Sequence, residues 1–205
     1  MSAADVQRKS MFLPGVEQNP KPGTYMELIE AARASGIEYW QIWHLLAFQP
    51  DAARNLVEFS QVVMNDPAPL SPRLRELIAA YTSSLNQCKF CMKAHAAVAA
   101  HMYQDEGLVA GVLRDPETST LSEKEKAVLR FVRKVTFASA DINPADTERL
   151  RAMGWDDAAI FYIITVCALF NFYNRWVSAS GVPLVSDEAF RRLAAPMAEK
   201  GYSRN

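Results

Sequence analysis

The stretch Leu70–His95 reads LSPRLRELIAAYTSSLNQCKFCMKAH and predicts two consecutive helices. Ser71 followed by Pro72 marks the start of the first, because proline suits the first helical position. Apolar residues then recur at helical spacing, at Leu74, Leu77, Ile78 and Tyr81. We expect the second helix to begin near Asn86 and to end at about Tyr103. The stretch therefore predicts a helical hairpin, and the other elements extend from its two ends.

The second helix of this hairpin carries Cys88, Cys91 and His95, which are two of the three cysteines and one of the three histidines in the chain. At about 100° per residue, Cys91 lies about 60° and His95 about 20° from Cys88, so we expect one shared helix face. Cys91 and His95 are i,i+4 neighbours, and an imidazole one turn from a thiol can take its proton. Because a thiolate attacks disulfides and peroxides, this spacing predicts redox chemistry.

Helix signals continue on both sides of the hairpin. Upstream, we expect a helix from a Thr24–Glu27 capping box to Gly36, a second over Glu38–Phe48, and a third from Asp51 to about Met64. Downstream, we expect helices from a Ser122–Glu125 capping box, from Asn143 to Gly154, from Asp156 to Ser180, and from Ser186 onward. No run of strict polar–apolar alternation interrupts this pattern, so the sequence predicts an all-α protein.

The length of 205 residues and the 50% hydrophobic content suffice for one sizeable core. We expect a single helical domain over residues 1–205, with an N-terminal extension at about 1–37, a core at about 38–185 and a C-terminal helix at about 186–205. The helices that follow Ser71 and Ser122 are each succeeded by a more apolar helix. This is typical of a duplicated helical hairpin, although capped amphipathic helices resemble one another without duplication.

Charge and hydropathy exclude several classes of partner. The formal net charge is −1, from 22 basic and 23 acidic residues, so we expect no nucleic acid and no anionic membrane as a partner. The longest apolar run, Ala158–Phe170, is too short to cross a bilayer. Residues Met1–Lys9 lack the apolar stretch of a secretory signal. We therefore expect a cytoplasmic protein, in which a CxxC pair is more often catalytic or metal-binding than structural.

The segments Leu70–Ile78 and Leu85–His95 resemble the alkylhydroperoxidase (AhpD-like) branch of the carboxymuconolactone decarboxylase superfamily. The shared elements are an Arg-Glu-Leu helix, a following Leu-Asn, and CxxCxxxH. The similarity extends, with less specific motifs, to His44–Ala47 upstream and to Asn171–Arg175 downstream, where it looks most like the peroxidase-related branch. The resemblance implies an all-helical fold, an AhpD-like helical bundle. It also implies assembly into homo-oligomers and a dithiol/disulfide cycle in which a glutamate and a histidine relay the proton.

Carried onto this chain, the resemblance makes Cys91 the peroxidatic cysteine, Cys88 the resolving cysteine, His95 the base and Glu76 the relay carboxylate. Because Cys91 is the i,i+4 neighbour of His95, we expect it to be the more acidic thiol. The founding members have a histidine immediately before the second cysteine, whereas this chain has Phe90, which cannot pass a proton. By spacing alone, Glu76 would be a solvated surface carboxylate.

The implied substrate is a hydroperoxide, and the cysteine pair would be reset by an external dithiol: a lipoyl group, thioredoxin or a small thiol. Nothing in the sequence resembles a flavin or nicotinamide site, so we expect no cofactor and no metal. We also expect a homo-oligomer, because the aromatic residues suggest generous apolar surfaces. The residues concerned are Trp40, Trp43, Phe161, Phe170, Phe172 and Trp176.

Several alternatives stay open at this point. The CxxC–His set is also compatible with a zinc site that lacks its fourth ligand, or with unreactive buried thiols. The rival functions are a decarboxylase-like enzyme acting on a small acid or lactone, a thiol-disulfide reductase, and a redox sensor without turnover. His44 suits either the core or a pocket wall, and Cys167 suits an inert buried thiol. Asn171, Asn174 and Arg175 suit either a subunit contact or the cysteine pocket.

Overall fold

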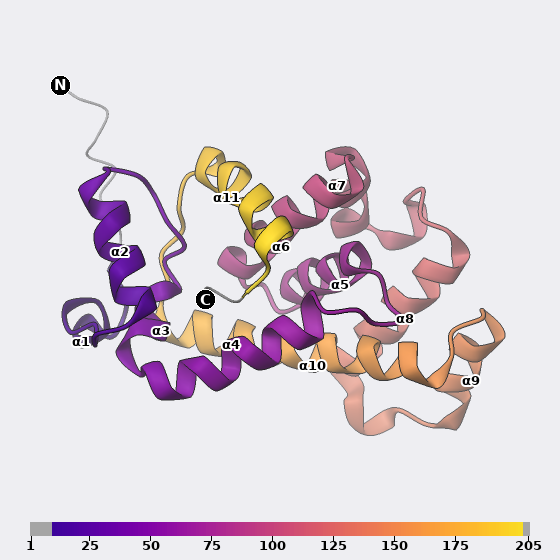
Figure 1. Cartoon of the computed structure of the whole chain (residues 1–205). Helices are drawn as coiled ribbons and strands as arrows, with labels where there is room; N and C mark the ends of the chain where they lie inside the picture. Colours follow the sequence, from indigo (N-terminus) through magenta and orange to yellow (C-terminus); the bar gives the residue numbers. More distant parts are fainter. Residues whose placement is uncertain (1–9, 203–205) are drawn as a thin grey trace.

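The computed structural model describes residues 10–202 of the chain, and residues 1–9 and 203–205 lie outside the described part. Residues 10–202 form eleven α-helices and two short 3-10 helices, with no strand among them, so the all-α prediction is confirmed (Figure 1). The N-terminal residues on which the expectation of a cytoplasmic location partly rests, and the last residues of the predicted C-terminal helix, lie outside the described part.

The α-helices are α1 (Pro14–Gln18), α2 (Thr24–Ala34), α3 (Trp43–Phe48), α4 (Pro50–Met64), α5 (Pro72–Leu85), α6 (Lys89–Tyr103), α7 (Glu106–Arg114), α8 (Glu123–Ala138), α9 (Pro144–Ala152), α10 (Asp157–Ser180) and α11 (Asp187–Lys200). The 3-10 helices are η1 (Pro116–Thr118) and η2 (Ser139–Asp141). The predicted hairpin is α5–α6, and the pair packs more extensively than any other two elements.

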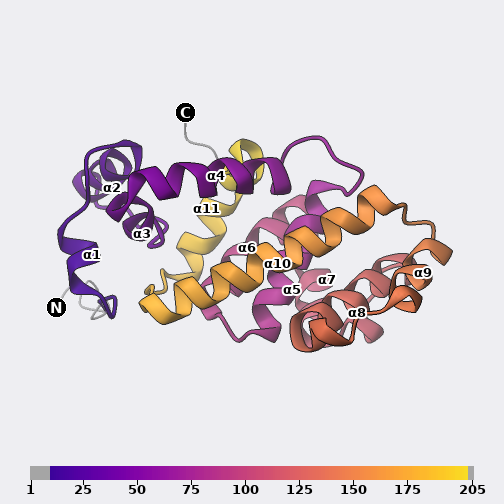
Figure 2. The same ribbon diagram turned by 90° about the horizontal axis from the view of Figure 1, so that it is seen from below.

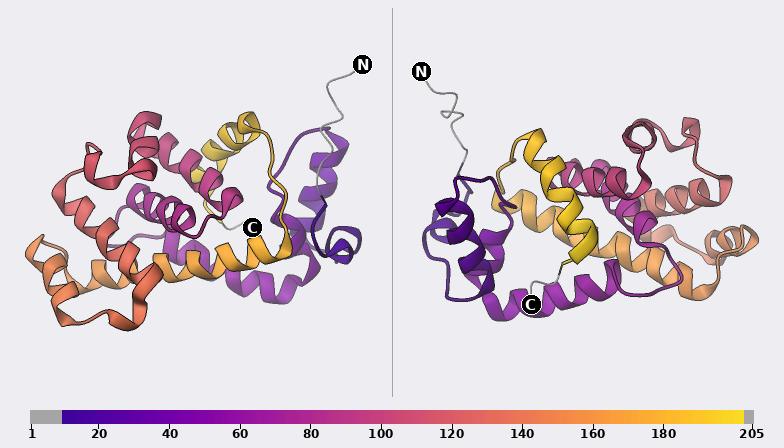
Figure 3. Two further views of the ribbon diagram at one scale, coloured as in Figure 1. Left: turned by 180° about the vertical axis from the view of Figure 1, so that it is seen from behind. Right: turned by 45° about the horizontal axis from the view of Figure 1, so that its top comes forward.

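Helix α10 is the long element along which the other helices are arranged. It runs along one side of the molecule and packs against α4, α5 and α8, as the views in Figures 1 and 2 agree. Helices α1, α2 and α3 gather at one end of the molecule, and α8 and α9 at the other. The C-terminal α11 returns to pack on α6, as Figure 3 shows from two further sides. The two ends of the sequence therefore flank the central hairpin.

Helix α5 is buried on every side from Leu74 to Ser83, which makes it the central helix of the fold. Its burial includes a charged side chain, Arg75, which is only 1% exposed. The guanidinium donates hydrogen bonds to the carbonyl oxygens of Leu70 (2.7 Å), Val63 (3.1 Å) and Asp66 (2.9 Å). These bonds compensate for the loss of hydration and fix the loop between α4 and α5 against α5. The sequence pattern did not predict this role.

Several predicted helix starts are wrong in detail. The N-cap of α2 is Gly23 and Thr24 is already helical, so the Thr24–Glu27 capping box does not form. Helix α4 starts at Pro50 with Gln49 as its N-cap, which leaves Asp51 inside the first turn. The predicted helix over Glu38–Phe48 is helical only in α3, because the chain before Trp43 forms a turn with a Trp43 N–H to Trp40 carbonyl bond of 3.0 Å.

Other boundary predictions are confirmed. Ser122 and Glu125 form a reciprocal capping box, and Asn143, Asp156 and Ser186 each cap the helix that follows. Helix α10 ends at Gly181, whose φ is 69°, and a Cβ there would lie 2.6 Å from the Phe12 ring. A glycine is therefore required at this turn for both backbone and steric reasons. Helices α1 and α7 were not predicted. The single-domain organisation and the hairpin duplication stay predictions.

Helix α10 is long and apolar enough to cross a membrane by length and composition, but half of its most apolar window is buried inside the fold. That amount of burial is typical of a core helix. Its inner face supplies Ile163, Val166 and Phe170 to the main core, whereas Phe161 and Phe172 on its outer face are 61% and 49% exposed. Figure 2 shows α10 crossing the face nearest the viewer. The outer face is thus an apolar surface without a covering element from residues 10–202.

The outer face of α10 contains the only candidate aromatic residues that remain well exposed for the predicted contact between copies of the chain. Trp40 and Phe170 are buried, and Trp43 and Trp176 are partly buried within the chain, so only Phe161 and Phe172 of the six proposed aromatic residues are well exposed. We expect the protein to be a homo-oligomer that contacts its copies through the outer face of α10. Phe161→Glu combined with Phe172→Glu should reduce the mass measured by light scattering at micromolar concentration.

The matched control is Ile37→Glu, which changes a residue that is 49% exposed in the α2–α3 connection. It should leave the measured mass unchanged. A monomer mass for the unmodified protein would contradict the prediction of an oligomer, and an unchanged oligomer in the double variant would contradict its placement on α10.

Candidate functional site

Helix α6 begins one residue after Cys88, so Cys88 is the N-cap of this helix. The chain turns sharply before it, where Gln87 has a φ of 56° and the Cys88 N–H donates to the Ser83 carbonyl at 3.0 Å. The prediction that the CxxC–His set shares one helix face is therefore wrong for Cys88, because the turn out of α5 ends only at this residue. Cys91 and His95 do lie within α6 as i,i+4 neighbours.

Cys88 is the more acidic of the two thiols. A hydrogen bond from the Cys91 thiol lowers the pKa of Cys88 to about 6, with further help from the Ser178 hydroxyl, the Cys91 backbone N–H and nearby His95. The pKa of Cys91 is raised, because its thiol donates to Cys88 and because it is buried. The expectation that Cys91 would be the more acidic thiol is therefore wrong, because the Cys91 thiol donates to Cys88 and favours the thiolate there.

Behind Cys91, His95 is held by Glu76 of α5. The distance from His95 Nδ1 to Glu76 Oε2 is 2.6 Å, and Glu76 is only 2% exposed. A carboxylate accepts hydrogen bonds, so Nδ1 donates to Glu76 and Nε2 is the ring nitrogen left to exchange a proton. Contrary to the spacing argument, Glu76 is not a solvated surface carboxylate, because α5 is buried all round. The structure thus brings Glu76 and His95 together as the resemblance implied.

Aromatic rings fix the orientation of the His95 imidazole. The Phe170 ring contacts it edge-on, with centroids 4.4 Å apart, and Tyr202 lies nearly parallel to it at 6.3 Å. Tyr202 follows α11, and its backbone N–H donates to Gln61 of α4 at 2.8 Å. The imidazole is therefore held by Glu76 from α5, by a ring from α10 and by a ring from the C-terminal segment.

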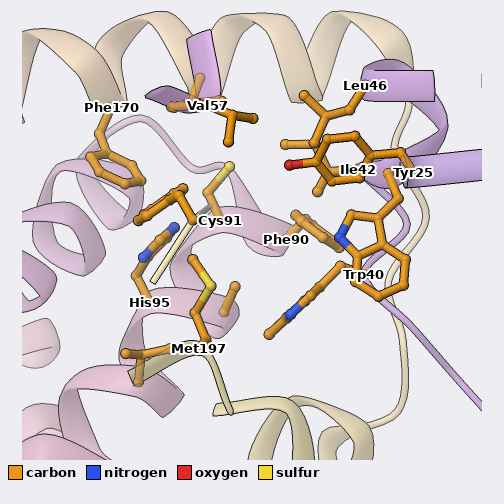
Figure 4. Close-up of a pocket in the computed structure, with 15 residues that line it drawn as sticks. Tyr25, Trp40, Ile42, Leu46, Val57, Phe90, Cys91, His95, Phe170 and Met197 are labelled. Atoms are coloured by element: carbon orange, nitrogen blue, oxygen red, sulfur yellow. The ribbon is translucent and has the colours of Figure 1, made fainter. Parts of the chain in front are cut away.

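Cys91 and His95 face a pocket of about 80 Å³ (Figure 4). Figure 4 shows Cys91, His95 and Phe170 along one side of it, with Tyr25 and Trp40 opposite. The full lining consists of Tyr25, Trp40, Ile42, Trp43, Leu46, Val57, Phe90, Cys91, Ala94, His95, Val98, Phe170, Tyr173, Met197 and Tyr202. None of these described residues is Lys, Arg, Asp or Glu, and Cys88 is not among them. The pocket is apolar apart from the Cys91 sulfur, the imidazole, and the phenol and indole groups of its aromatic wall.

Sequence reasoning missed part of this wall. Tyr25 comes from α2, in the predicted N-terminal extension, and Met197 and Tyr202 come from the C-terminal segment. No local motif distinguishes these residues from ordinary core or surface positions, because only the tertiary fold brings both ends of the chain to α6. Phe90 also lines the pocket, and its ring packs edge-on against Trp40 with centroids 6.2 Å apart. At the position where the founding members have a histidine that can carry a proton, this chain has Phe90, which forms part of the apolar wall.

The structure shows where the residues lie whose roles the sequence left open. His44 is completely buried and its Nε2 lies 3.0 Å from the Tyr39 hydroxyl, so it is a core histidine outside the pocket. Burial raises the pKa of the Cys167 thiol, as expected of an inert cysteine. Asn174 is buried and its amide donates to Ser83 Oγ at 2.8 Å, whereas Arg175 is exposed. Within residues 10–202, no group of three or more His, Cys, Asp or Glu side chains is arranged to hold a metal ion.

Comparison with known families and structures gives consistent matches. The model of the carboxymuconolactone decarboxylase family matches residues 50–134, which include both cysteines, His95 and Glu76. No curated protein matches the chain. The chain is similar to an uncharacterized peroxidase-related protein from Silicibacter sp. TM1040, with 29% identity, a TM-score of 0.71, and coverage of 80% of this chain and 87% of that one.

Two further structures extend the comparison. An uncharacterized peroxidase-related protein with an alkylhydroperoxidase AhpD core, from Ralstonia eutropha JMP134, has 28% identity and a TM-score of 0.71 over 80% of this chain and 86% of that one. The debrominase Bmp8, in complex with 2,3,4-tribromopyrrole, has 18% identity and a TM-score of 0.64 over 97% of this chain and 95% of that one. At this identity, the debrominase shows a shared fold alone.

The acidity of Cys88 gives a direct prediction. Thiolate absorbance should appear as the pH rises through about 6. Cys91→Ala removes the thiol that donates to Cys88, so the transition should move toward the ordinary cysteine value of about 8.5. Because the folded-state pKa is lower than that of an unfolded thiol, ionisation of Cys88 should stabilise the fold above about pH 8.5. This contribution should be lost as the pH falls through about 6.

The measurement is ultraviolet absorbance against pH, with Cys167→Ala as the control that removes the unrelated thiol. The control should leave the low-pH transition in place. A transition near the ordinary thiol value in the unmodified protein would contradict the assignment of the thiolate to Cys88.

Proposed function

The chain belongs to the alkylhydroperoxidase (AhpD)/carboxymuconolactone decarboxylase superfamily, and we propose that it is a thiol-dependent peroxidase that reduces hydroperoxides through a Cys88–Cys91 dithiol/disulfide cycle. The observation that carries this proposal is the pocket in which the Cys91 sulfur and the His95 imidazole are the two reactive groups. A thiol beside an oriented base, in a water-poor apolar site, suits attack on an uncharged oxidant.

The first step forms a sulfenic acid at Cys91. His95 Nε2 takes the proton of the Cys91 thiol, while Glu76 stabilises the imidazolium through the 2.6 Å bond to Nδ1. The sulfur attacks the terminal oxygen of the hydroperoxide, an S–O bond forms and the O–O bond breaks. The imidazolium then returns the proton to the departing alkoxide, which leaves as an alcohol. Cys91 is oxidised by two electrons and the peroxide is reduced by two.

The second step uses the acidity of Cys88. With a pKa of about 6, Cys88 is a thiolate at neutral pH and needs no further base. It attacks the Cys91 sulfur, the S–S bond forms, and the hydroxyl group leaves as water after protonation. An external dithiol then restores the pair by attacking the Cys91 sulfur from the pocket. Cys88 is the better leaving group in that exchange, because a thiol of lower pKa leaves faster.

The charge of the pocket favours this reaction over a decarboxylase-like activity on a small acid. A carboxylate in an apolar cavity is costly unless a cation or several donors compensate for its lost hydration. Among the described residues that line the pocket, none is Lys or Arg. A neutral hydroperoxide carries no such cost, so the lining supports peroxide reduction as the function.

The division of labour between the cysteines can be tested with one equivalent of an organic hydroperoxide. Cys91→Ser should abolish peroxide reduction, whereas Cys88→Ser should consume one equivalent and accumulate a sulfenic acid at Cys91. Mass spectrometry after trapping of the sulfenic acid locates the modified residue. Cys167→Ser is the matched control and should retain turnover, because Cys167 lies in the main core away from the pocket.

Trapping of a sulfenic acid at Cys88 in the Cys91→Ser variant would reverse the two roles. Peroxide reduction that continues when both cysteines are replaced would remove the dithiol cycle altogether. Disulfide reduction under the same reductant, without reaction with the hydroperoxide, would assign the protein as a thiol-disulfide reductase.

The roles of His95 and Glu76 lead to a separate prediction. His95→Asn should slow peroxide reduction by about 10²-fold or more, because it removes the group that accepts and returns the proton. Glu76→Gln should have a smaller effect, since it changes the group that orients the imidazole. His101→Asn changes an exposed histidine in the last turn of the same helix and should leave the rate unchanged. A folded His95→Asn protein with the unmodified rate, at an unchanged melting temperature, would contradict the role of His95.

A further inference from the structure

The C-terminal residues 197–202 close one side of the reactive pocket. Met197 and Tyr202 both line this pocket, and the Tyr202 ring lies nearly parallel to the His95 ring, with centroids 6.3 Å apart. The Tyr202 backbone N–H donates to Gln61 Oε1 of α4 at 2.8 Å. Because His95 belongs to α6, the segment bridges α4 and α6 across the pocket. We call residues 197–202 the C-terminal lid.

The lid packs closely against α4 at Gly201. This glycine has a φ of 66°, and a Cβ there would overlap Gln61 Oε1 and lie 2.7 Å from Asn65 Cγ. Gln61 Oε1 also accepts the hydrogen bond from the Tyr202 N–H, so it cannot move away from a Cβ and keep that bond. A side chain at position 201 therefore forces the lid or its acceptor to move.

The first part of α11 is anchored independently of the lid. The Phe190 ring packs against the rings of Trp40 and Phe90, each with centroids 5.9 Å apart, and α11 packs on α6. Pro196 lies between this anchored part and the lid. A proline inside a helix has no N–H to donate to the preceding turn, so it weakens the helix at that point. The lid can therefore leave α4 while the first turns of α11 stay on α6.

The volume of the closed pocket limits which molecules reach Cys91. The pocket has a volume of about 80 Å³. An apolar cavity of about 150 Å³ holds one benzene molecule, which corresponds to roughly 25 Å³ for each non-hydrogen atom. By this measure the closed pocket holds about three such atoms, which are the peroxide group and about one atom more. A hydroperoxide with a larger organic group does not fit behind the closed lid.

We propose that Met197 and Tyr202 determine the size of the substrate. The closed lid admits hydrogen peroxide or the smallest alkyl hydroperoxide, and a hydroperoxide with a larger organic group reaches Cys91 only when residues 197–202 leave α4. On another side of the pocket, Trp40 is buried in an aromatic cluster, whereas the lid has a proline at its base. The substrate class rests on the proposed function, whereas the lid itself does not.

The lid can be tested without any peroxide, by alkylation of Cys91 in a Cys88→Ser background. Two uncharged reagents are compared at one pH by mass spectrometry: iodomethane, which is similar in size to a peroxide group, and N-phenylmaleimide, which carries a phenyl ring. Both react with the thiolate, so the ratio of their rates reports access to Cys91 and not its acidity. Gly201→Ala should raise the rate with N-phenylmaleimide, relative to iodomethane, by about tenfold or more.

Tyr202→Ala should raise the same ratio, because removal of the ring enlarges the pocket even with the lid in place. The matched control is Gly154→Ala, between α9 and α10, where φ is 81° and a Cβ would lie at an ordinary 3.5 Å from Lys124 Nζ. It introduces similar backbone strain and should leave the ratio unchanged. Melting temperatures show whether each variant is folded. If Gly201→Ala does not fold, Gln61→Leu replaces it, because it removes the acceptor of the Tyr202 N–H.

An unchanged alkylation ratio in the folded Gly201 variant would overturn the lid, and an unchanged ratio in folded Tyr202→Ala protein would overturn the size limit set by this ring. With Cys88 present, turnover of cumene hydroperoxide relative to hydrogen peroxide should rise in the same variants. Raised alkylation ratios in a protein that reduces neither peroxide would support the lid and reject the peroxidase. Reduction of both peroxides, with unchanged alkylation ratios, would do the opposite.

Discussion

The hydrogen bond between Glu76 and His95 is the interaction on which the site depends. A carboxylate that is 2% exposed is costly to bury, and the imidazole one helix away provides the partner that compensates for it. The same bond sets the imidazole tautomer and connects α5 to α6 directly behind Cys91. Because α5 is buried on all sides, the carboxylate cannot move toward solvent without disturbing the core. The hydrogen bond to this fixed carboxylate therefore restricts the motion of the His95 imidazole.

The second constraint is the turn between α5 and α6, which separates the properties of the two cysteines. Cys88 ends the turn and accepts a hydrogen bond from the Cys91 thiol, whereas Cys91 lies one turn inside α6 and faces the pocket. The pKa of Cys88 is thus the lower of the two, and Cys91 is the sulfur that lines the pocket. In the proposed cycle this separation is useful, because the charged sulfur resolves the sulfenic acid and later leaves as a thiolate. Two residues of one motif acquire different roles from backbone geometry.

The sequence predicts the helices with strong caps and periodic apolar faces, such as α5, α8 and α10, because their signals are local. The sequence does not predict features that depend on tertiary contacts. One example is Arg75, which can be buried because carbonyl groups at the end of α4 and in the following loop accept its hydrogen bonds. For the site, CxxCxxxH and its resemblance predict that Cys91, His95 and Glu76 belong together. The order of thiol acidity was not predictable from helical spacing, since it depends on where α6 begins.

The site combines reactive residues inside the family match with a pocket wall that lies mostly outside it. The family match, residues 50–134, contains the two cysteines, Glu76 and His95. Most of the aromatic wall lies outside it, in Tyr25 and Trp40 before the match and in Phe170 and Tyr202 after it. Tyr202 contacts the imidazole itself, so the C-terminal segment influences both the base and the size of the pocket. The two flanking segments therefore supply most of the aromatic wall of the pocket, while the α5–α6 hairpin holds both cysteines, Glu76 and His95.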